Sequence, residues 1–508
     1  MPRRSPPAAL AVLLLVVVLA GSLAAGWLVA SRVSADPPVA VTPPDPAEPV
    51  YDAGDPAEPP PRPRAAAPTG TPVPASGSPV EPPAPVTQSP PAAPEPPPAT
   101  SPDPAPAPAP DPTPAPAPAP APPDRTVTPY APPPTIGIAA EALPPEGEAW
   151  ARLLEARRSA APGSQERADI DWLVSFARTA ATPGRPEGRR ATARRALRVN
   201  AWWFARRGSP GERVIARDPD GVILTYKRGH GFMVNPVATL GRWRGLNELW
   251  TPAQLADAVL PMLVERAHNG REWAALEYFD VPGQPDAVRP GVSGMAQARA
   301  AALFAKAHAA TGDPRHLQAA ERVLRSFEVP VDAGGVLAQV PDPAGGAGGP
   351  WYPERAYPGR PAWTGAALNG FMVTIIELRR AAASLDRAGS TESGSSTMGA
   401  STTATGPAAP APAPDATDAA RLARDLAARG ERSLTRFLPL HDSGEWSFYG
   451  LLTPGKPWRS YLADLNYHCY HVSLLRTLAA LYPGNGHGGL ADRWQGYVDA
   501  KGVTCPVR

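Results

Sequence analysis

The sequence predicts a mainly α-helical protein: an α/α toroid with a small β-hairpin region, preceded by one transmembrane helix and a disordered Pro-rich stalk. Three observations predict it: an uncharged apolar run near the N-terminus, a Pro- and Ala-rich stretch, and then repeated amphipathic segments separated by Gly, Pro, Trp and Tyr. In a toroid, antiparallel helix pairs form an inner and an outer ring, and loops at one mouth form the binding cleft. Helical periodicity alone also permits a solenoid.

The first 35 residues are predicted to be a signal anchor. The run from Ala8 to Ala30 is uncharged and about long enough for one membrane-spanning helix. Arg3 and Arg4 precede it, which favours an N-terminus inside and export of the remainder. A cleaved signal peptide, cut near 33–36, stays open. We therefore expect a single-pass protein of the cell membrane with its C-terminal domain extracytoplasmic.

Residues 36–136 are predicted to be a disordered linker. Pro makes up 73 of the 508 residues, and most of it lies in this stretch. Because bulky apolar side chains are scarce here, the segment cannot bury enough surface to offset its chain entropy. A second low-complexity segment, at about 386–418, is predicted to be a disordered insertion within the folded domain at 137–508.

The folded domain reads mostly as helices with one hairpin. Apolar residues at helical spacing predict helices within 146–159, 164–182, 185–208, 251–270, 293–313, 314–329, 363–385, 415–438 and 466–483. Ser164 is predicted to cap the second of them. Two β-rich runs flank Asp218-Pro219-Asp220-Gly221, which predicts a hairpin near Val214–Tyr226.

The helix at 185–208 is strongly basic. It carries eight arginines between Arg185 and Arg207, against the single acid Glu187. Such a face suits a polyanion or an anionic membrane, whereas arginine stems that cover apolar surface are the structural alternative.

Charge, residue spacing and motifs give no support for nucleic-acid, metal or nucleotide binding. The net charge of +2 gives no support for nucleic-acid binding. Whether Cys469 and Cys505 form a disulfide stays open. No metal site is predicted, because nothing is spaced to complete a ligand set with His468, Cys469 and His471. No nucleotide-binding loop is visible, and we expect no cofactor.

One segment near the C-terminus is unusually rich in tyrosine and histidine. Tyr467, His468, Tyr470 and His471 fall within five residues of a predicted helix, and Tyr449 precedes them among turn residues. Tyr467 and His471 are four residues apart and share a helix face. Such a helix either lines a cleft or is an ordinary core helix.

Three phrases resemble, in the same order, the C-terminal region of the D-glucuronyl C5-epimerases. They are "RPGVSGMAQARAAALFAKAHAATGD", "WYPERAYPGRPAWTGAALNGFMVTIIEL" and "LPLHDSGEWSFYGLL…NYHCYHVSLLRTL". These enzymes convert glucuronate to iduronate within heparan-type chains. The resemblance runs from about Phe232 to about Leu481.

The resemblance implies which residues carry the reaction. By match to the family's tyrosine phrases, the catalytic residues are Tyr357 (with Tyr352 as the alternative), Tyr449 and Tyr467. The expected substrate-binding residues are Glu354, Arg360, His468 and His471. Removing the C5 proton of a uronate needs a base and an acid on opposite ring faces, and cations around the carboxylate. Tyr449 and Tyr467 are predicted to be that pair, with Tyr357 auxiliary.

The chain departs from the family pattern in several places. Arg299 stands where the family usually has Gln, and Asn466 where it has Asp. Leu451 and Leu452 replace an arginine that follows the first tyrosine. The larger β-rich region that precedes the helices in animal members is missing.

The expected function is that of a membrane-anchored uronate C5-epimerase acting on a uronic-acid polysaccharide. A polysaccharide lyase and a catalytically silent carbohydrate-binding protein are the main alternatives. A glycoside hydrolase using Glu354 with Glu445 or Asp464 is a further one. The identity of the polysaccharide stays open, as does a homodimer.

Overall fold

A computed structural model describes residues 135–210, 214–242, 249–279, 290–340, 348–359, 366–395, 415–450 and 462–506. These residues contain eleven α-helices and short strands, which confirms the prediction of a mainly helical protein. The predicted membrane span and nearly all of the predicted stalk lie outside the described residues. Within the described residues, no helix is both long and apolar enough to cross a membrane.

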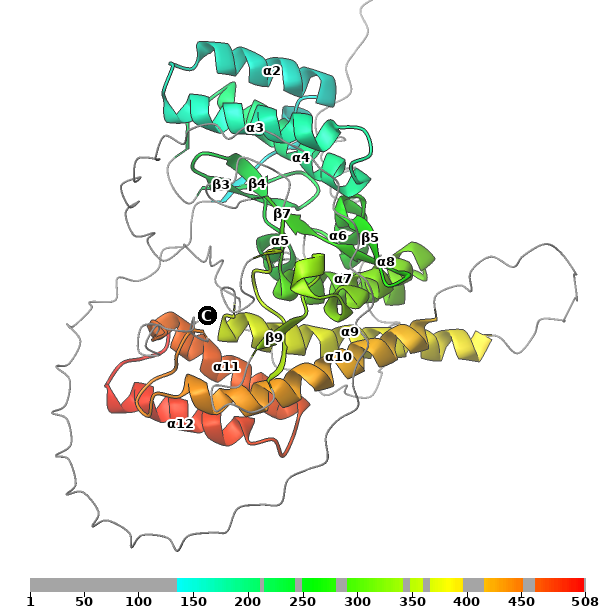
Figure 1. The fold of residues 1–508 in the computed structure, drawn as a ribbon, viewed down its shortest axis with the longest axis vertical. Coiled ribbons are helices and arrows are strands. Elements are labelled where there is room, and N and C mark those ends of the chain that lie inside the picture. Colours follow the sequence, from blue (N-terminus) through cyan, green and yellow to red (C-terminus); the bar gives the residue numbers. More distant parts are fainter. Residues whose placement is uncertain are drawn as a thin grey trace, which may run out of the picture. The chain divides into compact units, whose positions relative to one another are not determined.

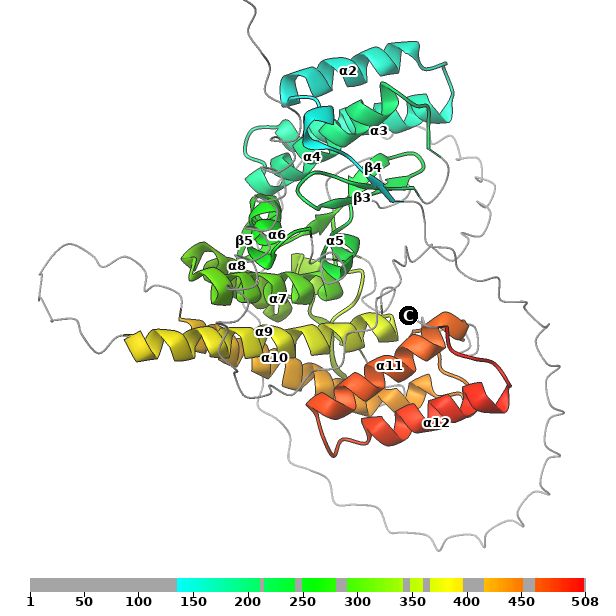
Figure 2. The ribbon, with the colours of Figure 1, turned by 180° about the vertical axis from the view of Figure 1, so that it is seen from behind.

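The first described part combines three helices with a four-stranded sheet (Figures 1 and 2). The helices are α2 (Glu146–Ser159), α3 (Gln165–Ala181) and α4 (Glu187–Phe204), and each contacts the other two. The Ser164 side chain accepts a hydrogen bond from the Arg167 amide at 3.2 Å, so the predicted cap of α3 is confirmed.

The predicted hairpin is confirmed as the centre of that sheet. The strands are β1 (Thr135–Gly137), β2 (Ile215–Arg217), β3 (Ile223–Lys227) and β4 (Gly231–Val234), in that order across the sheet. The Asp218 carboxylate accepts hydrogen bonds from the amides of Asp220 (3.0 Å) and Val222 (2.9 Å), which shapes the turn between β2 and β3. Strand β1 takes in the last two residues of the predicted linker.

The predicted helix at 251–270 is wrong in its second half. The structure has α5 (Pro236–Arg242), α6 (Pro252–Val259), β5 (Val264–His268) and β6 (Arg271–Ala275) in this region. Pro261 interrupts the helix, and Asn269 (φ 48°) and Gly270 (φ 74°) form a two-residue turn between the strands. Asn-Gly between two short strands is a hairpin signal, and the sequence analysis did not use it.

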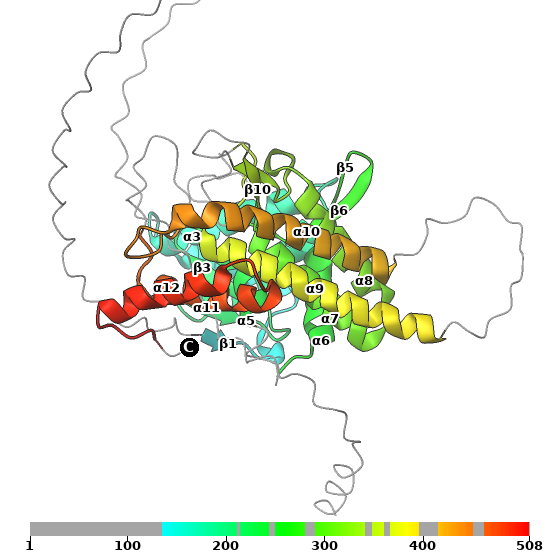
Figure 3. The same ribbon diagram turned by 90° about the horizontal axis from the view of Figure 1, so that it is seen from below.

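The remaining elements form the helical body that carries the candidate site. They are β7 (Glu277–Tyr278), β8 (Gly291–Val292), α7 (Gly294–Thr311), α8 (Pro314–Arg325), β9 (Ala338–Val340), β10 (Gly349–Trp351), α9 (Leu368–Ser395), α10 (Ala416–Phe437), α11 (Leu465–Leu481) and α12 (His487–Ala500). Helix α9 contacts α7, α10 and α11, and α9 and α10 run antiparallel side by side (Figures 1 and 3). Antiparallel pairing agrees with the predicted toroid, whose closure stays a prediction. Helix α12 was not predicted.

The segment between α9 and α10 is shorter than the insertion that the sequence suggests. Helix α9 continues to Ser395 and α10 begins at Ala416, so both ends of the predicted segment 386–418 are helical. They stay helical because they pack on each other: Ala388 is buried, and a Cβ on Gly389 would lie 3.3 Å from the Thr417 hydroxyl. Residues 396–414 lie outside the described residues.

The arginines of α4 are largely engaged within the protein. Arg189 binds the buried Glu277 carboxylate with two nitrogens, at 2.6 and 3.0 Å. Arg195 pairs with Asp218, and Arg194 bonds Glu187 at 2.6 Å. These contacts favour the structural reading of this helix over a polyanion-binding face.

Cys469 and Cys505 form a disulfide, with their Cα atoms 5.6 Å apart and 36 positions apart in the sequence. It fastens the C-terminal tail to α11. We expect reduction, or the Cys505→Ser substitution, to lower the free energy of unfolding by about 2–4 kcal/mol, because a loop of this length is freed in the unfolded state. Urea unfolding with and without reductant measures this. The Cys505→Ser protein, with no disulfide left, is the control and should not respond to reductant.

Candidate functional site

Tyr449 and Tyr467 lie against each other, whereas the sequence analysis expects them on opposite faces of the substrate. Their ring centroids are 4.5 Å apart in an edge-to-face arrangement, and their side chains are hydrogen-bonded. Tyr467 is in the first turn of α11, where Asp464 caps the helix by accepting from the Tyr467 amide at 2.8 Å. The Tyr449 carbonyl accepts from the Leu368 amide at 2.8 Å, which fixes Tyr449 beside the start of α9.

Glu354 reaches the same turn of α9 from a different segment. A Cβ on Gly370 would lie 2.9 Å from the Glu354 Cβ and 3.1 Å from its Oε2, so this position needs a glycine for the approach. Two residues on, Ala356 exchanges backbone hydrogen bonds of 2.7 and 2.9 Å with Val292 of β8. The segment with Glu354 is therefore held by Gly370 of α9 and by Val292 of β8. It lies close to Tyr449, which is fixed at the same end of α9.

Burial is the main reason that Tyr449 stays protonated. Burial raises the pKa of Tyr449 and the negative charge of Glu354 raises it further, while the hydrogen bond with Tyr467 and the charge of Arg355 oppose this. Burial also raises the pKa of Glu354, against the lowering effects of Arg355 and Arg299. Tyr449 is thus set up as a proton donor, with an acid-base group of raised pKa next to it.

His468 and His471 hold the loop that carries Tyr449. We call residues 441–450 the tyrosine loop. Ser447 of this loop donates its amide to the His468 Nδ1 at 3.1 Å, and its hydroxyl lies 2.8 Å from that atom and 2.9 Å from the His471 Nδ1. Both imidazoles are fully buried, and Trp446 stacks on His468 with centroids 3.7 Å apart. These contacts give the histidines a positioning role, and their predicted contact with substrate stays a prediction.

The other predicted tyrosines, Tyr352 and Tyr357, have contacts of their own. Tyr352 is fully buried and donates to the Leu426 carbonyl at 3.1 Å, and burial raises its pKa to about 12, so it belongs to the core. Tyr357 packs on Gly291, since a Cβ there would lie 2.2 Å from the Tyr357 ring. Arg360 lies outside the described residues. The structure thus joins Tyr449, Tyr467 and Glu354.

Sequence reasoning missed Ser447 and Arg355. Ser447 is fully buried and bridges two histidines, yet a lone serine carries no sequence signal. Arg355 stands next to Glu354 in the phrase "WYPERAYP", so the sequence analysis could have named it as a candidate.

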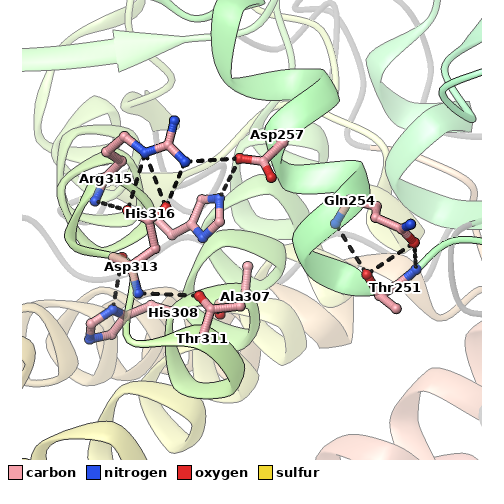
Figure 4. A network of polar contacts seen from close by, with 9 residues as sticks. All are labelled: Thr251, Gln254, Asp257, Ala307, His308, Thr311, Asp313, Arg315 and His316. Carbon is pink, nitrogen blue, oxygen red and sulfur yellow. Dashed lines mark hydrogen bonds and ion pairs between the residues drawn. The ribbon is translucent and has the colours of Figure 1, made fainter.

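The described residues contain one cluster with the composition of a metal site, formed by Asp257, Asp313 and His316 (Figure 4). Arg315 already supplies a positive charge there, with nitrogens 2.7–3.2 Å from the Asp313 carboxylate oxygens. His316 Nε2 bonds Asp257 at 3.2 Å. The cluster joins α6 to the turn between α7 and α8, about 27 Å along α7 from Gly294. We assign it to packing of these helices.

The buried His441 of the tyrosine loop predicts a pH-dependent stability. Burial lowers the pKa of His441 to about 4, although its Nδ1 bonds the Phe448 carbonyl at 3.3 Å. The unfolded chain binds this proton below about pH 6.5 and the folded chain does not, so stability is complete above pH 6.5 and falls towards pH 4. We expect a loss of about 3 kcal/mol from His441 across this window.

Urea unfolding between pH 7.5 and 4.5 measures this loss, and the His441→Gln variant should show a smaller decline. An equal slope in both proteins would contradict the assignment to His441. His468, whose pKa burial also lowers, contributes in the same direction and accounts for slope that remains in the variant.

Comparisons with known proteins show what the region around this site resembles. Residues 278–496 match the family model described as the D-glucuronyl C5-epimerase C-terminus. The chain is 28% identical over 250 residues to the D-glucuronyl C5-epimerase of Caenorhabditis elegans, a match covering 48% of this chain and 35% of the worm protein. The chain therefore spans about a third of the length of that curated relative. Tyr357, Tyr449, Tyr467 and Glu354 all lie inside the matched region. Residues 278–496 are thus similar to the C-terminal domain of the D-glucuronyl C5-epimerases.

Proposed function

We propose that the protein is a membrane-anchored, extracytoplasmic C5-epimerase that acts on uronic acids within a polysaccharide by removing and returning the C5 proton. The proposal rests on Tyr449, which contacts Tyr467 and lies close enough to Glu354 for the charge of that carboxylate to raise its pKa. All three residues lie in the region that matches the C-terminal domain of the family. The family match supports epimerase chemistry in general. The glucuronate-to-iduronate direction and the polysaccharide substrate are part of the proposal.

The site has groups suited to each step of this reaction. Tyr449 stays protonated because burial raises its pKa, so its hydroxyl carries the proton that returns to C5. Glu354, when ionised, accepts the proton that leaves C5, and Tyr467 restores the proton of Tyr449 through their hydrogen bond. The edge contact of the two tyrosine rings leaves no room for a sugar between them. We therefore propose that the two tyrosines act on one face of the sugar ring as a coupled pair, and that Glu354 takes the C5 proton from the opposite face, because inversion at C5 needs groups on both faces.

Export and anchoring rest on the sequence and on the disulfide. A disulfide such as Cys469–Cys505 persists in oxidising compartments, which agrees with an extracytoplasmic domain. The apolar run from Ala8 to Ala30 is the proposed anchor, and the Pro-rich stretch after it is the proposed spacer.

A catalytically silent carbohydrate-binding protein is the second candidate. It is favoured by the leucines at 451 and 452, where family members have an arginine, and by the arginine at 299. Such a protein binds a uronan and leaves its C5 centre unchanged.

The test is incubation of the full-length protein with a panel of glucuronate-containing polymers, followed by NMR and chain-length analysis. We expect iduronate signals to appear without shortening of the chain. An unsaturated, ultraviolet-absorbing product would instead establish a lyase. Binding without any change to the polymer would establish the silent protein.

A further inference from the structure

A uronate substrate brings a carboxylate into a site that already holds one. Proton removal at C5 adds further negative charge to that group, so a cation must lie close to it. Glu354 lies beside Tyr449 and cannot serve this purpose, because two carboxylates repel each other. Arg360, which the sequence suggests for this purpose, lies outside the described residues, and among the described residues an arginine near Tyr449 is suited to it.

Two arginines lie close enough to act on the charge of Glu354: Arg299 and Arg355. Arg299 is on α7, is only 3% exposed, and donates to the Val237 carbonyl at 3.3 Å. It is enclosed by the protein and is suited to neutralising Glu354 from behind. A ligand does not reach it without opening the core.

Arg355 differs from Arg299 in its position and in the exposure of its side chain. It is partly exposed, and it lies between Glu354, packed on Gly370, and Ala356, paired with Val292. Its backbone is thereby held at the start of α9, where the Leu368 amide also fixes Tyr449. Its charge acts on Glu354 and on the Tyr449 hydroxyl.

We propose that Arg355 binds the carboxylate of the uronate whose C5 faces Tyr449, and so makes this site selective for uronic acids over neutral sugars. The inference rests on the proposed function, since it assumes that the tyrosine site receives a uronate. A guanidinium suits the task because its planar donors match a carboxylate in a bidentate contact. Arg299 keeps Glu354 neutralised while Arg355 engages the ligand.

The test is a binding comparison that does not depend on turnover. The full-length protein is titrated with an unsulfated glucuronate–N-acetylglucosamine polymer and with the same polymer after its carboxyl groups are reduced to alcohols. We expect wild type to prefer the uronate polymer, and Arg355→Gln to lose roughly 10- to 100-fold of that preference. Arg355→Lys should keep part of the preference, because it retains the charge.

Arg421→Gln is the matched control. Arg421 is exposed on α10 and pairs with Asp418 at 2.7 Å, so its loss changes the net charge equally without touching the site. Circular dichroism confirms that each variant is folded. An unchanged preference in Arg355→Gln would overturn the proposal, as would a wild type with no preference or no binding to either polymer. Preference without any C5 chemistry in wild type would overturn the proposed function alone.

Discussion

Replacing Tyr449 with Phe is expected to reduce C5 proton exchange by roughly 10²- to 10⁴-fold, the usual contribution of a positioned proton donor. The variant loses one hydroxyl and its hydrogen bond with Tyr467, while the ring contact at 4.5 Å is retained. Stability should therefore change by only about 1 kcal/mol. The measurement is the rate of deuterium uptake at C5 in D₂O, with urea unfolding of the same sample.

Tyr482→Phe is the matched control for this substitution. Tyr482 lies just after α11, and its hydroxyl is buried with no hydrogen-bond partner among the residues that the structure describes. Removal of that hydroxyl should leave exchange unchanged. If Tyr449→Phe and Tyr482→Phe exchange equally fast, Tyr449 is not the proton donor.

Replacing Trp351 with Ala is expected to lower the free energy of unfolding by about 3–5 kcal/mol. Trp351 is fully buried and stacks on Phe371 of α9 with centroids 3.9 Å apart. Its ring centroid also lies 6.1 Å from the ring centroids of Phe437 of α10 and His441 of the tyrosine loop. The cavity would lie beneath the elements that hold Tyr449 and Glu354, so activity should fall together with stability.

Chemical denaturation measures this loss, and Trp202→Ala is its control. Trp202 is partly exposed on α4, where Arg206 lies over its ring at 5.5 Å. Its removal should cost less than that of Trp351, because a partly exposed side chain loses less burial. Equal losses in the two variants would show that Trp351 is not central to this core.

The helical architecture was predictable because long amphipathic segments dominate the chain, and their caps are local. The Ser164 cap and the Asp218 turn depend on a few consecutive residues and came out as predicted. The 251–270 segment failed because its apolar pattern fits a helix, while Pro261 and the Asn269–Gly270 turn decide otherwise.

The site was predictable only in part. Tyr449 and Tyr467 were identified through resemblance, and the structure places them in contact. The burial of His468 and His471 around Ser447 depends on how the tyrosine loop folds back on α11, which no local pattern encodes. The roles of Arg299 and Arg355 follow from the approach of α7 and the Glu354 segment, which are distant in sequence.

The most direct test of the central claim is proton NMR of a uronic-acid polymer incubated with the full-length protein in D₂O. The proposed function predicts deuterium at C5 of the uronate, in both its glucuronate and iduronate forms, with the chain length preserved and with almost no uptake for Tyr449→Phe. Uptake that is equally fast in Tyr449→Phe, or polymer that is bound but keeps all its C5 protons, would contradict it.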